Sequence, residues 1–183
     1  QPHPLGIYGR TKLEGEREVA RIGEGASVIM RSAWLYSAHP KNFVLTMLRL
    51  MREKESVSVV SDQAGTPTWA RGLAEAIWAT ADRPEMRGVY HWTDAGEASW
   101  YDFAVAIGEE ALAAGLIGRP ASVRPIRTAD YPTAAVRPPY SVLDMTSTCA
   151  ALGRSPPHWR VSLRLMLQEL ARGLVCTILF IFA

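Results

Sequence analysis

The stretch SVIMRSAWLY, residues 27–36, decides the fold class of this chain. It is apolar and partly β-branched, which is typical of a strand buried in a sheet. A helix is predicted before it, over residues 8–22, and the glycines at 23 and 25 end that helix. A second helix is predicted over residues 42–54, with one apolar face formed by Phe43, Met47, Leu48 and Met51. The order helix, strand, helix favours an α/β protein.

The rest of the sequence extends this alternation. Short strands are predicted at residues 57–61, 88–93 and 123–126, and helices at 69–81, 99–116 and 162–172. The proline-rich segment 127–141 is predicted to be a loop. Because the pattern begins on a helix, we interpret the chain as the C-terminal part of a Rossmann-like doubly wound sheet plus a small α/β substrate-binding region. The N-terminal dinucleotide-binding half is then absent.

This interpretation divides the chain into three parts. Residues 1–61 would be the remnant of the Rossmann domain, and residues 62–172 mainly the substrate-binding region. Residues 173–183 form an atypical apolar tail, with LVCTILFIFA at 174–183. A membrane helix needs about 20 apolar residues, so this segment is too short to span a bilayer. We expect it to be a buried strand, or else an exposed and aggregation-prone tail.

Composition narrows the possible partners and the compartment. The 183 residues carry a net charge of +2, with 48% hydrophobic and 21% charged residues, as in ordinary globular domains. This charge gives no reason to expect a nucleic acid or a membrane as partner. Cys149 and Cys176 lie outside any Cys-x-x-Cys spacing, which excludes a cysteine-ligated zinc site and a disulfide framework. Together with the lack of a secretory leader, this favours the cytoplasm.

Tyr8 and Lys12 are the residues whose spacing suggests chemistry. Four positions apart on a helix, they lie on one face, one turn apart. An ammonium group near a phenol favours the phenolate and is expected to lower the pKa of Tyr8. Such a tyrosine can act as general acid towards a carbonyl oxygen, while the lysine binds a ribose hydroxyl. The alternative is an exposed helix start with a solvated lysine.

The surroundings of this pair resemble the extended short-chain dehydrogenase/reductase family, and within it the dTDP-4-dehydrorhamnose reductases. The segment PLGIYGRTKLEGE, residues 4–16, resembles the active-site helix of that family. Further blocks follow in family order up to about residue 172: RSAWLY (31–36), NFV (42–44), DQAGTPT (62–68), GVYH (88–91), SWYDFA (99–104), YPT (131–133), AVRP (135–138), SVLD (141–144), Trp159 and MLQEL (166–170).

The resemblance implies reduction of the 4-keto group of dTDP-4-dehydro-rhamnose by NADPH or NADH, giving dTDP-rhamnose for cell-surface polysaccharide. Tyr8 would be the general acid, and Lys12 would bind the cofactor ribose and tune Tyr8. Trp34 resembles the family tryptophan that packs on the substrate sugar, although a core tryptophan at a strand end is the alternative. Asn42, Gln63 and Arg137 are candidates for polar contacts with the nucleotide sugar. A solvated loop arginine is the alternative for Arg137, and for Gln63 a role in fixing its loop is the preferred interpretation.

Other polar residues are interpreted as structural. Gln63 and Thr68 are expected to fix their loop, His91 to lie in the core, and Ser99 with Asp102 to form a capping box. Arg71 stands near the point where some relatives carry a glutamate that serves a metal-bridged dimer. Since arginine cannot ligate a metal, no metal site is predicted, although a homodimer of another kind is compatible with the resemblance.

The sequence also departs from the family. It contains no G-x-x-G-x-x-G dinucleotide loop, and only seven residues precede Tyr8, too few to include the family's catalytic Ser or Thr. We therefore expect the isolated chain to be inactive and to bind nicotinamide cofactor weakly. Two alternatives remain: another nucleotide-sugar reductase or epimerase, and a non-catalytic regulatory subunit of the same fold.

Overall fold

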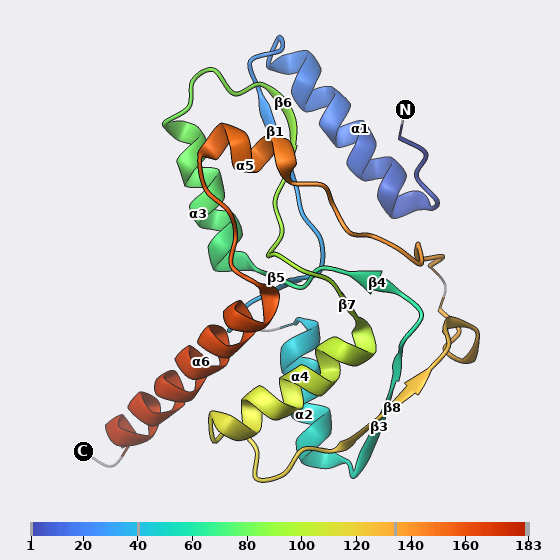
Figure 1. Cartoon of the computed structure of the whole chain (residues 1–183), viewed down its shortest axis with the longest axis vertical. Helices are drawn as coiled ribbons and strands as arrows, with labels where there is room; N and C mark the ends of the chain where they lie inside the picture. Colours follow the sequence, from blue (N-terminus) through green and yellow to red (C-terminus); the bar gives the residue numbers. More distant parts are fainter. Residues whose placement is uncertain (1, 40, 134, 182–183) are drawn as a thin grey trace.

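Helices and strands alternate along the chain, as the sequence predicted. The computed structural model describes residues 2–39, 41–133 and 135–181, and of residues 174–181 the backbone alone. The elements are α1 (Ile7–Ile22), β1 (Val28–Arg31), β2 (Leu35–Tyr36), α2 (Phe43–Glu53), β3 (Ser56–Val60), β4 (Ala64–Gly65), β5 (Thr68–Trp69), α3 (Ala70–Ala81), β6 (Gly88–His91), β7 (Ala98–Ser99), α4 (Trp100–Ala113), β8 (Ser122–Ile126), a 3₁₀ helix (Thr128–Asp130), α5 (Thr146–Leu152) and α6 (Trp159–Ile181). Figure 1 shows their arrangement.

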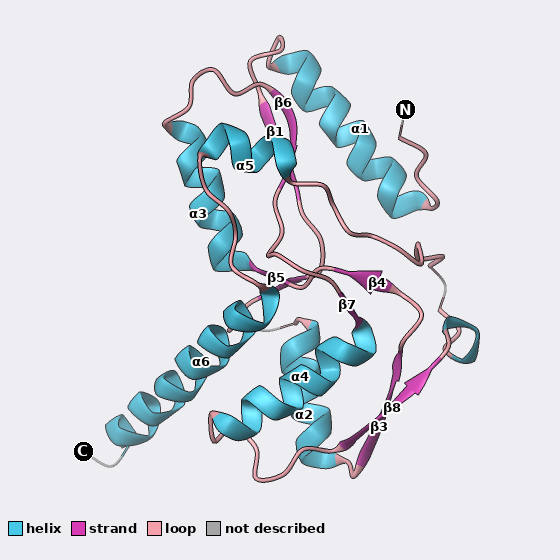
Figure 2. Cartoon of the chain, in the orientation of Figure 1, coloured by secondary structure: helices cyan, strands magenta, loops and turns pink. Residues whose placement is uncertain are grey.

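Within the described residues the strands form four pairs, three of them parallel. β1 pairs with β6, β2 with β5 and β3 with β8 in parallel, while β4 pairs with β7 in antiparallel fashion. Parallel pairing requires a long connection between the partners, and helices supply it here. The predicted α/β class is therefore confirmed (Figure 2).

Two hydrophobic clusters form the core. The larger one lies among α2, α4, α6 and β3, with Phe103, Ile107, Leu163 and Met166 almost completely buried. The smaller one, around Trp92 and Met86, joins α3 and α5 to β1 and β6. Each cluster contains residues from both sides of position 61, so the predicted domain boundary there does not coincide with a division of the core.

Two helices, α2 and α4, begin at residues whose side chains cap them. The Asn42 side chain caps α2 by accepting a hydrogen bond from the backbone of Leu45. Ser99 and Asp102 form the predicted capping box at the start of α4, with reciprocal bonds of 3.0 Å and 2.9 Å. These caps satisfy backbone N–H groups that the first helical turn leaves free.

The predicted strand at the C-terminal end is wrong. Helix α6 starts earlier than predicted, at Trp159, and the backbone stays helical to Ile181. Periodicity cannot distinguish a short apolar strand from a helical segment, and extending an existing helix avoids the cost of nucleating a new element. The last two residues of the predicted tail, 182–183, lie outside the described residues.

Two further differences concern single segments. The predicted strand 27–36 is interrupted between β1 and β2, because the chain turns at Trp34, where φ is +48°. Helix α5 lies in a segment for which no helix was predicted; it ends at Gly153, whose φ of +63° suits a glycine. Among the described residues, no helix combines the length and apolar character that crossing a membrane requires.

Candidate functional site

A small hollow of about 130 Å³ brings together residues from distant parts of the chain. Trp34 and Arg137, two of the predicted substrate-binding residues, both line it, together with Gln63. Its complete lining is Ala33, Trp34, Gln63, Trp100, Arg137, Pro138 and Ser141. Aromatic faces beside a guanidinium group suit a sugar that is linked to a phosphate, because the C–H face of a sugar is apolar and the phosphate is anionic.

Trp34 lies at the boundary between this hollow and the core. Its backbone is in the left-handed region, which bulky residues rarely adopt, and its carbonyl accepts a 3.1 Å hydrogen bond from the backbone of Thr68. The half-buried indole packs against the larger core cluster and also lines the hollow. Trp34 thus has the core contact of one interpretation and also lines the hollow, while its role towards a sugar stays a prediction.

The DQAGTPT segment, of which Gln63 lines the hollow, makes its side-chain hydrogen bonds within the protein. The buried Gln63 donates a 3.0 Å hydrogen bond to the hydroxyl of Thr128. The Asp62 carboxylate accepts bonds from both the hydroxyl and the backbone N–H of Thr128, and these bonds lower the pKa of Asp62. Thr68 donates to the carbonyl of Thr66. Gln63 and Thr68 therefore have structural contacts of the kind expected from the sequence.

Arg137 differs from these residues because it is exposed and unpaired. Within the described part of the chain, no carboxylate lies at ion-pair distance from its guanidinium. Its planar donors are free to meet an anion at the edge of the hollow.

Asn42 does not line the hollow, and capping engages its amide. Its Oδ1 accepts from the Leu45 N–H at 3.1 Å, while Nδ2 donates to the carbonyls of Ser37 at 2.9 Å and His39 at 2.8 Å. An asparagine just before an apolar helical run is typical of an N-cap, and the hydrogen bonds of Asn42 are those of an N-cap.

Tyr8 and Lys12 lie together on α1, as their spacing predicted. The Lys12 Nζ is 5.5 Å from the centroid of the Tyr8 ring, and the Tyr8 side chain is exposed, at 77% of its full area. Within the described residues, no hydrogen bond or ring contact joins either side chain to the hollow. Their catalytic role stays a prediction.

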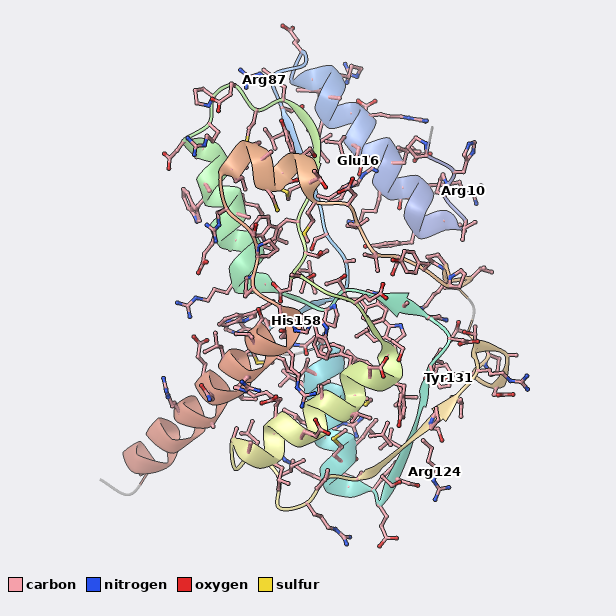
Figure 3. The ribbon with its side chains drawn as sticks, viewed as in Figure 1. Arg10, Glu16, Arg87, Arg124, Tyr131 and His158 are labelled. Atoms are coloured by element: carbon pink, nitrogen blue, oxygen red, sulfur yellow. The ribbon has the colours of Figure 1, made fainter. Side chains whose placement is uncertain are left out.

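A bidentate ion pair attaches α1 to the strand that leads to Trp34. Arg31 at the end of β1 donates to both carboxylate oxygens of Glu16, at 2.8 Å and 2.6 Å. Figure 3 shows Glu16 on the side of α1 that faces β1. The hydrogen bonds from Arg31 lower the pKa of Glu16, against the effect of burial. Because no residue of α1 is fully buried, this pair is an important restraint on the helix that carries Tyr8.

Asp94 is a buried carboxyl group that supports the fold near the site. It is 1% exposed, and its Oδ2 accepts a 3.2 Å hydrogen bond from the backbone of Trp69, where α3 begins. Its Oδ1 has no partner among the described residues. Burial raises the pKa of Asp94 to about 6, although the nearby Trp69 N–H and Ser162 hydroxyl act in the opposite direction.

A larger hollow elsewhere lacks the predicted chemistry. Its volume is about 410 Å³, and it lies at the C-terminal ends of α2 and α4, lined by residues 51–55 and 117–119. Two of its arginines are engaged within the protein: Arg119 pairs with Glu55 at 3.7 Å, and Arg52 donates to the carbonyl of Leu116.

The described residues also hold no group of three or more His, Cys, Asp or Glu side chains arranged for a metal ion. Arg71, at the position discussed for a metal bridge, pairs with Glu75 and Glu169 and so connects α3 to α6.

Sequence reasoning gave no site role to four residues of the hollow, namely Ala33, Trp100, Pro138 and Ser141. Trp100 was present in the block SWYDFA, but no role was assigned to it. Ser141 lines the hollow, and its hydroxyl donates to the carbonyl of Ala64. No local pattern indicates that Trp100 and Trp34 meet, because the contact depends on the tertiary fold.

Comparisons with known proteins identify the family of this chain. The pattern of the family described as RmlD substrate binding domain matches residues 1–172. The dTDP-4-dehydrorhamnose reductase of Aggregatibacter actinomycetemcomitans is 40% identical over 167 residues, which are 88% of this chain and 56% of that protein. The spore coat polysaccharide biosynthesis protein SpsK of Bacillus subtilis is 41% identical over 166 residues, covering 91% of this chain and 55% of SpsK.

A solved structure supports the same family assignment. The dTDP-4-dehydrorhamnose reductase of Bacillus anthracis, crystallised in complex with NADP, superimposes with a TM-score of 0.84 at 34% identity, over 92% of this chain and 57% of that one. This chain therefore spans somewhat more than half the length of the relatives that it matches, which is consistent with the predicted C-terminal part. On the family match over residues 1–172, the chain belongs to the RmlD substrate-binding domain family.

Proposed function

We propose that this chain provides the substrate-binding part and the Tyr–Lys pair of an NADPH- or NADH-dependent reductase. The reaction is reduction of the 4-keto group of dTDP-4-dehydro-rhamnose to dTDP-rhamnose. The observation that carries the proposal is the hollow in which Trp34 and the unpaired Arg137 meet, in a chain of this family. The aromatic wall suits the deoxyhexose, and the free guanidinium suits the diphosphate.

Tyr8 and Lys12 fit the reductive step. When bound, the nicotinamide cofactor supplies the hydride for the keto carbon. Tyr8 donates its phenolic proton to the carbonyl oxygen, so that a ketone becomes a secondary alcohol. The ammonium of Lys12 lies beside the Tyr8 ring, one helical turn on, and offers hydrogen bonds to a ribose hydroxyl. Both side chains are exposed on one face of α1, which leaves them accessible to a cofactor.

The remaining expectations about the protein follow from the same proposal. The natural partner is a nucleotide sugar, and the net charge of +2 gives no reason to add a nucleic acid. Cys149 is a free thiol, in keeping with the cytoplasm as the expected compartment. A homodimer stays a prediction from the resemblance.

Calorimetric titration of the purified chain with dTDP-rhamnose, the expected product, tests the proposal. We expect binding, and we expect Arg137→Ala to weaken it by about 10-fold or more, since hydrogen bonds to charged groups contribute about 1.5–3 kcal/mol. Arg124→Ala is the matched control, because Arg124 is also an exposed arginine but lies outside the hollow, on β8 (Figure 3). Failure of the parent chain to bind, or equal affinities of the two variants, would contradict the proposal.

A further inference from the structure

The main-chain conformation at Trp34 does not by itself fix the orientation of the indole ring. Its φ of +48° is an uncommon conformation for a bulky residue, and the turn there separates β1 from β2. On the C-terminal side, pairing of β2 with β5 holds the main chain in register. The indole extends from this turn to the wall of the hollow, so its orientation depends on what it touches.

Trp100 covers one face of that indole. The two rings are stacked with centroids 3.6 Å apart and planes 9° from parallel. Phe43 supports Trp100 in turn, at a centroid distance of 4.7 Å. Trp100 is the first residue of α4, just after the Ser99–Asp102 capping box, and Phe43 is the first residue of α2. The stack therefore connects Trp34 to the starts of two capped helices.

Gly65 confines the indole from another direction. A Cβ atom at this position would lie 2.5 Å from Cε2 of Trp34 and 2.7 Å from its Nε1. It would also lie 2.7 Å from the Ser141 hydroxyl oxygen. Only a glycine lets the ring approach the β4 backbone this closely. The indole is thus held between a bare backbone and a second indole.

We propose that Trp100 is a positioning residue for the nucleotide sugar, acting through Trp34. By fixing the plane of the Trp34 ring, it sets the surface against which the sugar lies and so the direction in which the sugar presents its keto carbon. This inference rests on the proposed function. Small errors in placing a reacting carbon are costly, since about 1 Å can reduce a rate by about 100-fold. The role assigned to Trp100 concerns the sugar and not the diphosphate.

Substitutions separate positioning from simple structural support. Trp100→Ala should weaken binding of dTDP-rhamnose by about 3- to 10-fold, the range expected for one aromatic stacking contact, and leave binding of dTDP, which lacks the sugar, within about twofold. Trp100→Phe, which keeps a flat ring, should recover most of the lost affinity. The control is Trp78→Ala, because Trp78 is 77% exposed on α3 and lies outside the hollow. Both ligands should bind this variant as they bind the parent.

A double-mutant cycle tests whether the effect passes through Trp34. If Trp100 acts by orienting that ring, Trp100→Ala should cost no further affinity for dTDP-rhamnose once Trp34 is already alanine. Circular dichroism gives an independent readout, because two stacked indoles couple their transitions and produce a paired band. That band should disappear in Trp34→Ala and Trp100→Ala and persist in Trp78→Ala.

The outcomes of these measurements distinguish a positioning role of Trp100 from general structural damage. Equal losses for dTDP and dTDP-rhamnose in Trp100→Ala would show general structural damage and overturn the positioning role. Additive losses in the double variant, or unchanged binding of dTDP-rhamnose, would overturn it too. If the parent chain binds neither ligand, the proposed function itself fails, and the role of Trp100 in sugar binding fails with it.

Discussion

Replacing Asp94 with asparagine should remove a pH-dependent loss of stability. The carboxyl group is 1% exposed, and burial raises its pKa from 3.8 to about 6. Below about pH 4 it is protonated in both the folded and the unfolded chain, so it contributes no pH dependence there. Between about pH 4 and 6 the unfolded chain releases the proton while the folded chain keeps it, so stability falls as the pH rises.

The size of this effect follows from the pKa difference. A shift of about two pKa units corresponds to about 3 kcal/mol of destabilisation once both states are ionised, above about pH 6. Between about pH 4.5 and 7.5, roughly 2 kcal/mol of this change takes place. Asparagine can keep the hydrogen bond from the Trp69 backbone but leaves an amide N–H group at the unpartnered Oδ1 position. This desolvation cost, about 1–3 kcal/mol, does not vary with pH.

Urea unfolding followed by tryptophan fluorescence, repeated across that pH range, measures the difference. The free energy of unfolding of Asp94→Asn minus that of the parent should increase by about 2 kcal/mol from about pH 4.5 to 7.5. Asp82→Asn, an exposed carboxyl group at the end of α3, is the control and should run parallel to the parent. A difference between Asp94→Asn and the parent that stays constant with pH would refute the reasoning, because it would mean that Asp94 is not desolvated.

Three further predictions concern the site and the helix that carries Tyr8. Glu16→Gln should speed hydrogen exchange of the α1 amides near neutral pH and not in acid. The reason is that the folded-state pKa of Glu16 is lowered, so its carboxylate stabilises the fold above the unfolded pKa and loses this effect as the pH falls through the folded pKa. Gly65→Ala should cost about 1–3 kcal/mol in urea unfolding, since its Cβ would meet Trp34 at 2.5 Å, while Gly118→Ala, with open space around the added Cβ, should be nearly neutral. With a dinucleotide-binding half joined ahead of residue 1, Tyr8→Phe should lower turnover by about 10²- to 10⁴-fold, the range expected for loss of a general acid. The melting temperature should not change, because Tyr8 is 77% exposed. Turnover within about threefold of the parent would remove Tyr8 from the acid role.

Features set by neighbouring residues could be predicted from the sequence. The capping box of Ser99 and Asp102, the placement of Tyr8 and Lys12 on one helix face, and most of the longer elements depend on side chains within one or two helical turns. The α/β class follows from the order of these elements. The apolar end of α6 was mistaken for a strand because its composition is compatible with both structures.

Features set by distant residues could not be predicted in this way. Strands β4, β5 and β7 have two residues each, and their pairing depends on where the tertiary fold places them. The same holds for Asp94, which binds the backbone at the start of α3 from 25 residues away. The stack of Trp34 on Trp100 joins the end of one strand region to the start of a helix. The family resemblance pointed to Trp34 but gave no reason to select Trp100.

Asn42 and Arg137, two candidates for a substrate contact, differ in the hydrogen bonds that they make within the protein. Its amide is engaged in capping α2 and in two backbone carbonyls, and that cap fixes the start of the helix at Phe43. Phe43, the first residue of that helix, contacts the Trp100 ring, and Trp100 stacks on Trp34. Arg137, by contrast, lines the hollow with no carboxylate at ion-pair distance in the described part of the chain. The polar groups that fix helix starts and loops thus make their hydrogen bonds within the protein. The aromatic wall of Trp34 and Trp100 and the guanidinium of Arg137 remain accessible to a ligand.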